Sequence, residues 1–487
     1  MGVSPESRKL PVWEVVDEIP TPPFFSVRGT LKLIGPGAIL LGISIGSGEW
    51  LVGPAVTAQF GGGLLWVALV SILFQVVMNM EFIRYTLYTG EPVYTGFMRT
   101  WPGKNFWAVV YSVLAFLQLG WPGWALAAST AIVAALIGEI PGDSAAPLVQ
   151  FFSVLCFVTT IGIVSAGSCV ERTMEYAQWF FIIATVSFLA VIAVVFTSSD
   201  TWLQVGRGLV NFGDIPPGVD WALLGAFAAY AGAGGVINGT LSNWFRDKGF
   251  GMGKAVGYIP TFVGGKKIAM SGTGKIFRPT AENFSRFRTW QKFAALDQYA
   301  LWAVGSLVGM VLPAVLSLEF IPRGTKLEGF GIAAYQAEYL SRVGGEAMWF
   351  VTLLVGFWVL YSTQLGITDC FTRMVTDILW SGSKRVRSFR GGEIRSVYYG
   401  VLLLFSFWGV FLLLSGLKPM FLIVVGANVA ALNFVVLGVH ALIVNHRFLP
   451  RELRPSLLET VVVLLGVVFY GFFFANSLPA MLGKLTG

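Results

Sequence analysis

The sequence predicts an all-α integral membrane protein with about eleven transmembrane helices. Of its residues, 55% are hydrophobic and only 12% are charged, whereas soluble domains average about 25% charged residues. The apolar runs continue for about 20 residues without the alternation of a β-barrel strand, so each can cross a bilayer as a helix. Together these observations exclude a soluble globular fold.

The predicted spans follow from windows of about 20 apolar residues. They cover residues 33–58, 63–88, 106–137, 148–167, 175–197, 220–244, 297–320, 346–380, 396–416, 418–444 and 456–481. We expect residues 1–30 to form a polar cytoplasmic tail and residues 31–455 to form one helical core. Residues 456–487 then hold the eleventh helix and the C-terminus. Residues 246–296 are a long polar and basic insertion within the core.

Basic residues predict how the helices are oriented. Lys and Arg concentrate in residues 246–296, 381–395 and 445–455, whereas residues 138–147 contain acidic residues and neither Lys nor Arg. Cytoplasmic loops of membrane proteins are enriched in Lys and Arg. A cytoplasmic N-terminus therefore puts every basic loop inside and the C-terminus outside. We expect a protein of a bacterial inner (plasma) membrane, whose net charge of +7 reflects these loops and not nucleic-acid binding.

The residue types that enzymes use are scarce. The chain has two histidines, His440 and His446, and three cysteines, Cys156, Cys169 and Cys370. It has no His-based triad, no CxxC pair and no H-E-x-x-H motif. We therefore expect no enzyme and no resident cofactor. Residues 1–30 lack the apolar segment of a cleavable signal peptide.

Glycine clusters interrupt two of the predicted spans. These are Gly46-Ser47-Gly48, followed by Glu49, in the first span, and Gly232, Gly234 and Gly235 in the sixth. Glycine disfavours helix, and irregular backbone at bilayer depth is tolerated where it lines a cavity, so we expect both helices to be unwound there. Close helix packing through small residues is the alternative interpretation.

The positions of the two breaks predict an internal repeat. Spans 1–5 and 6–10, residues 33–197 and 220–444, can be laid over one another with a broken helix at the start of each. An odd number of spans per repeat makes the two repeats inverted in the membrane. This is the 5+5 architecture of LeuT-fold secondary transporters, whose binding site lies at the broken helices 1 and 6.

Short motifs from about residue 33 to residue 445 resemble a known family in their order and spacing. They are Gly35-Pro36, Arg84 with Thr89-Gly90, Glu171-Arg172, Asp297, and Ser362-Thr363-Gln364 with Thr368. The pattern is similar to that of the natural resistance-associated macrophage protein (Nramp) family of divalent-metal transporters. The resemblance implies a LeuT-type fold and a divalent cation as the transported substrate.

Departures from the Nramp pattern concern the site itself. The family's Asp-Pro-Gly-Asn of span 1 is replaced here by Gly46-Ser47-Gly48-Glu49. In the family, span 6 carries a methionine whose thioether favours soft metals. Here the aligned position lies near Gly235, and no methionine is present there. Residues 106–137 contain neither Asp nor Glu, although acidic residues of span 3 serve the family's proton path. The departures imply altered metal selectivity and weak or absent proton coupling.

Glu49 is the first candidate for a ligand, because an ionisable group at the bilayer midplane marks function by default. A carboxylate flanked by exposed carbonyls suits a hard cation such as Mg²⁺, Mn²⁺ or Na⁺. The alternative is that Glu49 pairs with an Arg or Lys and only joins helices. The predicted substrate-binding residues are Gly46, Ser47, Gly48, Glu49, Gly232, Gly235, Asn238 and Gln364, with Glu49 as the metal ligand.

Two pairs of opposite charge lie within predicted helices. Glu81 and Arg84 are three residues apart, and Asp369 and Arg373 are four apart. Residues at these spacings face each other on a helix. We expect both to form ion pairs with a structural or gating role.

Three functions remain open from the sequence. The first is an Nramp-like transporter of a cation, with a divalent metal as the expected substrate, working by alternating access in the lipid bilayer. The second is a LeuT-fold transporter of a small organic solute, an amino acid or a carboxylate, because N–H groups freed at a helix break also attract anions. The aromatic Trp121 and Trp124 in span 3 would suit this second function. The third is a non-transporting protein that kept the fold. The sequence carries no signature of an oligomeric state.

Overall fold

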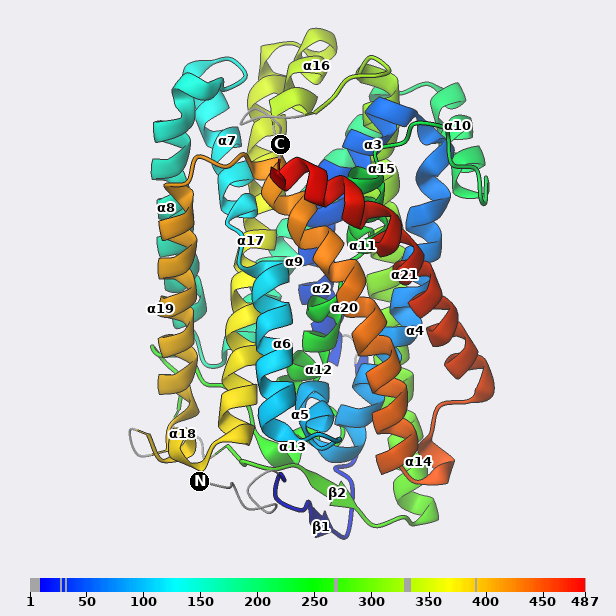
Figure 1. The fold of residues 1–487 in the computed structure, drawn as a ribbon, viewed down its shortest axis with the longest axis vertical. Helices are drawn as coiled ribbons and strands as arrows, with labels where there is room; N and C mark the ends of the chain where they lie inside the picture. The colour runs from blue at the N-terminus through cyan, green and yellow to red at the C-terminus, as the bar shows by residue number, and fades with distance from the viewer. Residues whose placement is uncertain are drawn as a thin grey trace.

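The computed structural model describes residues 9–26, 29–30, 33–266, 270–327, 334–389 and 392–486. This part of the chain is a bundle of long helices (Figure 1). Within it, 10 helices are long and apolar enough to cross a membrane, and a shorter apolar helix, Trp221–Tyr230, accompanies them. The prediction of an all-α integral membrane protein is confirmed, and the predicted spans fall on helices, the sixth on two helices with a break between them. The total of about eleven spans stays a prediction.

The helices follow one another along the chain with short connections. The first half contains α2 (Pro36–Ser44), α3 (Gly53–Phe60), α4 (Leu65–Thr89), α5 (Val93–Met98), α6 (Lys104–Leu119), α7 (Gly123–Ile137), α8 (Ala146–Ser165), α9 (Val170–Phe196) and α10 (Ser199–Leu209). The second half contains α11 (Trp221–Tyr230), α12 (Val236–Lys248), α13 (Gly253–Val256), α14 (Ala281–Ala295), α15 (Val304–Phe320), α16 (Tyr335–Gly344), α17 (Glu346–Gly382), α18 (Lys384–Ser388), α19 (Ile394–Leu413), α20 (Pro419–Phe448) and α21 (Leu457–Thr486).

The first span is continuous, and the prediction that it is unwound at Gly46-Ser47-Gly48 is wrong. A π-helix, Ile45–Val52, joins α2 to α3, so the backbone stays helical through the glycines and through Glu49. A π-helix has i→i+5 hydrogen bonds and occurs mostly as short insertions in α-helices, often at functional sites. It shifts the face of the helix while the backbone stays helical. Span 1 therefore offers side chains and packing surfaces rather than an unwound backbone.

The sixth span is interrupted where the sequence indicates. Helix α11 ends at Tyr230 and α12 begins at Val236. Between them Gly232, Gly234 and Gly235 have φ angles of 103°, 99° and 52°. Only glycine takes such angles without steric penalty, so these glycines are required by the backbone conformation.

The interrupted span lies in the interior of the bundle. Figure 1 shows α2, α11 and α12 enclosed by α4, α6, α17 and α20. Helix α11 packs against α20, α21 and the π-helix of span 1, and α12 packs against α4 and α2. The break in span 6 is thereby placed beside the π-helix of span 1.

The polar insertion and the N-terminal segment are folded together at one end of the bundle, the lower end in Figure 1. Strand β1 (Glu14–Val16) pairs in parallel with β2 (Lys275–Phe277), and the buried Ile19 N–H donates to Asn283 Oδ1 at 3.2 Å. Residues 9–26 of the expected N-terminal tail are therefore folded against the polar insertion, and the cytoplasmic location of the tail stays a prediction. The insertion that it contacts contains α13, β2 and α14, and α18 lies at the same end.

Candidate functional site

Glu49 is a buried carboxylate with no ion-pair partner among the described residues. Its side chain has 0% exposure, and neither carboxylate oxygen has a hydrogen-bond partner among the described residues. The backbone N–H groups of Glu49 itself and of Gly232, in the break of span 6, lie close enough to the carboxylate to stabilise its charge. On the other side lies Gly309 of α15, where an added Cβ would lie 3.8 Å from Glu49 Cδ. No described Arg or Lys side chain pairs with Glu49, so the structure gives no support to the alternative of a helix-joining ion pair.

Gly48 and Gly46 allow neighbouring helices to pack closely against span 1 beside Glu49. A Cβ at Gly48 would lie 1.8 Å from the carbonyl oxygen of Tyr230, the last residue of α11. A Cβ at Gly46 would lie 2.0 Å from Thr363 Oγ1 of α17. The expectation that the backbone is unwound at these glycines is wrong, and both allow close helix packing. Their assignment to the substrate-binding site stays a prediction. The side chain of Ser47 lies outside the described residues.

Gln75 of α4 pairs the polar backbone groups at the start of the span 6 break. Its Nε2 donates to the carbonyl of Ala231 at 2.7 Å, and its Oε1 accepts from the N–H of Ala233 at 3.1 Å. Oε1 also accepts from Asn238 Nδ2 at 3.1 Å. These bonds replace helical partners that the interrupted backbone lacks, as the apolar interior of a membrane requires.

Gln118 of α6 does the same at the other end of the break. Its Nε2 donates to the carbonyl of Gly234 at 2.9 Å, and its Oε1 accepts from the N–H of Val236 at 3.0 Å. Asn433 of α20 holds this amide in place, because its Nδ2 donates to the same Oε1 at 2.7 Å. Gly235 lies directly against it, since a Cβ there would be 2.4 Å from Gln118 Oε1. Side chains from two other spans thus bond the backbone groups at both ends of the break.

Replacing Gln75 by leucine should destabilise the protein through the backbone groups left unpaired. The substitution keeps the size of the side chain but removes both bonds to the break, at about 1–3 kcal/mol for each buried polar group left without a partner. The unfolding midpoint in detergent measures the change. Gln204→Leu on the exposed face of α10 is the matched control, expected within about 0.5 kcal/mol of the parent. Equal midpoints for the two variants would contradict this role of Gln75.

A chain of amides runs from the break towards the start of span 1. Asn238 Nδ2 donates to Asn79 Oδ1 at 2.9 Å, and Asn79 Nδ2 donates to Gln298 Oε1 at 2.9 Å. Gln298 Nε2 then donates to Asp297 Oδ2 at 2.9 Å. Asp297 accepts from the backbone N–H groups of Gly35 and Gly37, at 3.0 and 2.7 Å. Two motifs of the Nramp-like pattern, Gly35-Pro36 and Asp297, therefore meet as a cap on the N-terminus of α2.

The sequence reasoning missed most of this chain. Gln75, Asn79, Gln118 and Gln298 are all 0–2% exposed, yet none was singled out. A signal was present, because Gln75 and Asn79 are polar residues four apart in the middle of an apolar span, and polar residues inside the membrane mark interior faces. Asn238 was predicted and lies in the chain. Gln364 donates to Thr368 Oγ1 at 3.0 Å along its own helix α17.

Both predicted ion pairs are formed, and each belongs to a larger cluster. Arg84 pairs with Glu81 at 3.0 Å and also with Glu459 of α21 at 2.6 Å. Arg373 pairs with Asp369 at 3.0 Å and also with Asp247 of α12.

The cluster around Arg373 joins the second half of span 6 to α17. Arg246 of α12 completes it, pairing with Asp247 and, at 2.6 Å, with Asp377. Asp369 also accepts from Trp244 Nε1 at 2.8 Å and from Tyr398 Oη at 2.6 Å. Nearby, Lys248 of α12 pairs with Glu175 of α9. These contacts lie between α12 and the helices that surround it.

A metal site made of several acidic, histidine or cysteine ligands is not found in the described part of the chain. It contains no group of three or more His, Cys, Asp or Glu that could hold a metal ion. A cation at Glu49 would therefore be held by one carboxylate together with neutral oxygen atoms.

Comparison with known proteins shows the fold. The chain matches no protein-family model and no curated protein. It matches the structure of a point mutant of the Nramp-family manganese transporter of Eremococcus coleocola, with a TM-score of 0.64 and 14% identity over 97% of this chain and 91% of that one. The chain therefore has the fold of this membrane transporter. The Nramp resemblance of the sequence is confirmed at the level of the fold.

Two further LeuT-fold transporters match over most of their length. Mhp1, a nucleobase-cation-symport-1 family transporter, has a TM-score of 0.53 and 14% identity over 92% of this chain and 90% of that one. MhsT, solved in complex with L-phenylalanine, has a TM-score of 0.50 and 14% identity over 91% of this chain and 98% of that one. The LeuT-type fold is therefore shown, whereas the substrates of these proteins differ.

Proposed function

We propose that the protein is a secondary transporter that moves a cation, a divalent metal above all, by alternating access around Glu49. The observation that carries the proposal is the carboxylate of Glu49, fully buried beside the break of span 6 and without a described cationic side chain to balance its charge. In LeuT-fold transporters substrate and ion sites lie at this place. A buried carboxylate is costly unless an opposite charge compensates it, and a transported cation would supply that charge.

The polar atoms around Glu49 favour a cation over an anion. Ser306, one turn before Gly309 on α15, is also buried, and its hydroxyl has no partner among the described residues. By contrast, the N–H of Ala233 in the break is taken by Gln75, and the N–H of Val236 at the start of α12 is taken by Gln118. An organic carboxylate would need such N–H groups. The alternative of an amino acid or carboxylate substrate therefore has weaker support.

Oxygen ligands favour hard cations such as Mg²⁺ and Mn²⁺. The thioether of Met310 lies against Gly53, one turn beyond Glu49, because a Cβ at Gly53 would be 2.8 Å from its sulfur. Binding of Cd²⁺, which prefers sulfur ligands, should therefore be measured beside that of Mg²⁺ and Mn²⁺. Weak or absent proton coupling is part of the proposal, since residues 106–137 hold no acidic side chain.

The ion pairs of α12 would act as a gate in this proposal. Arg373 and Asp247 join α12 to α17, and Lys248 and Glu175 join α12 to α9. Alternating access moves spans 1, 2, 6 and 7 against the remaining spans. Opening at this end would separate these pairs.

Glu49→Gln tests the proposal, because glutamine has the shape of glutamate but no charge. We expect saturable binding of Mg²⁺ and Mn²⁺ by isothermal titration calorimetry, lost in the variant, and loss of metal uptake into proteoliposomes that carry an internal pH dye. The metal-free variant should be more stable by about 0.5–2 kcal/mol, as is common when a destabilising functional group is removed.

The control for Glu49→Gln is Glu346→Gln at the exposed start of α17, which should bind metal like the parent. A parent protein that binds neither ion would refute the proposal. A metal-free Glu49→Gln variant that melts well below the parent would instead indicate that Glu49 only holds helices together.

A further inference from the structure

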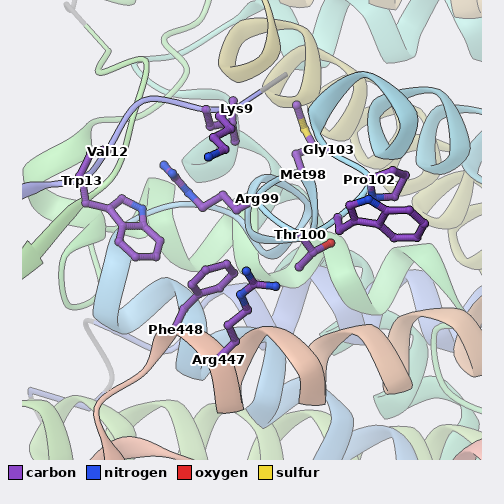
Figure 2. Close-up of a pocket in the computed structure, with 12 residues that line it drawn as sticks. Lys9, Val12, Trp13, Met98, Arg99, Thr100, Pro102, Gly103, Arg447 and Phe448 are labelled. Carbon is purple, nitrogen blue, oxygen red and sulfur yellow. The ribbon is translucent and has the colours of Figure 1, made fainter. Parts of the chain in front are cut away.

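Two adjoining cavities open at the end of the bundle that carries the basic loops. The first has a volume of about 620 Å³ and the second about 770 Å³, and both are bordered by Lys9, Leu10 and Val12. Figure 2 shows the first cavity, with side chains of the N-terminal segment on one side and of α20 on another. Its charged and aromatic walls are Lys9, Trp13, Arg99, Trp101, Arg447 and Phe448.

The walls of both cavities are basic. No acidic residue lines either one, and Lys104, Lys384 and Arg387 add to the second. Among the described residues, Lys9, Lys384 and Arg447 form no ion pair.

Arg99 is the exception, since its charge is balanced by Glu91. Burial alone would raise the pKa of Glu91, but the Arg99 guanidinium and its hydrogen bonds lower it. Glu91 therefore stays ionised and holds Arg99 in place. Lys9 and Arg447 are thus the cations of the first cavity that no described acidic side chain balances.

An apolar surface made by two neighbouring helices adjoins the first cavity. Helices α6 and α20 pack against each other and end at this cavity. Exposed apolar side chains follow both helices away from it, namely Phe106, Val109 and Val113 on α6 and Val439 and Ile443 on α20. Trp101, 85% exposed, stands at the rim. Tryptophan is enriched where the hydrocarbon core meets the headgroups, so the cavity lies at headgroup level.

We propose that the cavity between Lys9, Trp101 and Arg447 binds the headgroup of an anionic phospholipid of the adjacent leaflet. Its phosphate would lie between Lys9 and Arg447, and its acyl chains would follow the apolar surface of α6 and α20. Basic pockets between transmembrane helices bind anionic headgroups by this charge complementarity. A free phosphate compound shares the headgroup chemistry but gains nothing from the apolar surface.

Binding there would fasten the N-terminal segment to the transporter core. Arg99 Nη1 donates to the carbonyl of Pro11 at 2.8 Å, and its guanidinium lies 4.5 Å above the ring of Trp13. Strand β1, which pairs with β2 ahead of α14, begins at the next residue, Glu14. An occupied site would therefore stabilise the segment that leads to span 7.

The test compares lipids on the purified, full-length protein in detergent by native mass spectrometry and thermal shift. We expect phosphatidylglycerol to stay bound and to raise the melting temperature, and phosphatidylcholine to do neither. The double variant Lys9→Gln/Arg447→Gln should lose about fivefold in affinity for each charge removed. The matched control, Arg288→Gln/Lys292→Gln on the exposed face of α14, should bind like the parent.

Three results would overturn the proposal. Equal losses in both double variants would mean diffuse attraction to a basic surface rather than a site. Protection by inorganic phosphate or glycerol phosphate that equals the effect of phosphatidylglycerol would identify a soluble ligand. Equal retention of phosphatidylcholine would remove the role of charge. Metal binding at Glu49 is measured on the same variants, so failure of this site is distinguishable from failure of the proposed function.

Discussion

Replacing Arg373 by methionine should lower the free energy of unfolding by about 3–5 kcal/mol, the usual effect of removing one partner of a buried ion pair. Arg373 has 0% exposure and bonds both Asp247 and Asp369. Methionine fills a similar volume but leaves these two carboxylates facing each other without the cation between them. Asp247 keeps Arg246, and Asp369 keeps only the neutral donors Trp244 and Tyr398.

The control for this prediction has the same spacing and a different environment. Arg342 and Glu338 are also four residues apart on one helix, at 2.5 Å, but their side chains are 61% and 34% exposed. Exposed pairs of this kind contribute about 0.3–0.5 kcal/mol. The unfolding midpoints of Arg342→Met and Arg373→Met, measured in mixed detergent micelles, should therefore differ widely. Two small shifts would show that water reaches the Arg373 cluster and screens it.

Replacing Gly48 by alanine should destabilise the protein and stop metal binding. One methyl group would lie 1.8 Å from the Tyr230 carbonyl oxygen, and a backbone atom cannot turn away as a side chain can. Overpacking of a tight core costs about 1–3 kcal/mol. Here relief requires that the π-helix of span 1 and the end of α11 move apart, which separates Glu49 from Gly232. Thermal melting and Mn²⁺ titration measure the two effects.

Gly400→Ala is the control for Gly48→Ala. Gly400 lies within helix α19, and nothing lies within 4 Å of the position of an added Cβ. In such a place alanine stabilises a helix by up to about 1 kcal/mol relative to glycine. The two variants should therefore shift the melting temperature in opposite directions. Unchanged Mn²⁺ binding by Gly48→Ala would show that the close approach of spans 1 and 6 is not part of the site.

Local pattern was sufficient to locate the helices and the special positions within them. Length and apolarity of each run placed the spans, because crossing a bilayer requires about 20 apolar residues whatever their neighbours. The i,i+3 and i,i+4 spacings of Glu81–Arg84 and Asp369–Arg373 predicted ion pairs that are present. Glu49 was singled out because a charge within an apolar run is conspicuous by itself.

The partners of these positions were decided by tertiary packing. The two glycine clusters look alike in sequence, yet Gly48 serves a close helix contact inside a π-helix, whereas Gly232 has a φ of 103° in a real break. The difference depends on Tyr230, Gln75 and Gln118, which approach from other spans.

The sequence by itself determined a helical membrane protein with a carboxylate inside its first apolar span, and it predicted a transporter fold. Only the tertiary structure decided which span is broken, which amides close the break, and that no described cationic side chain pairs with Glu49. The physical reason is that apolarity and helical spacing are properties of consecutive residues. Hydrogen-bond satisfaction and steric fit in a membrane interior depend instead on atoms that are distant in the chain.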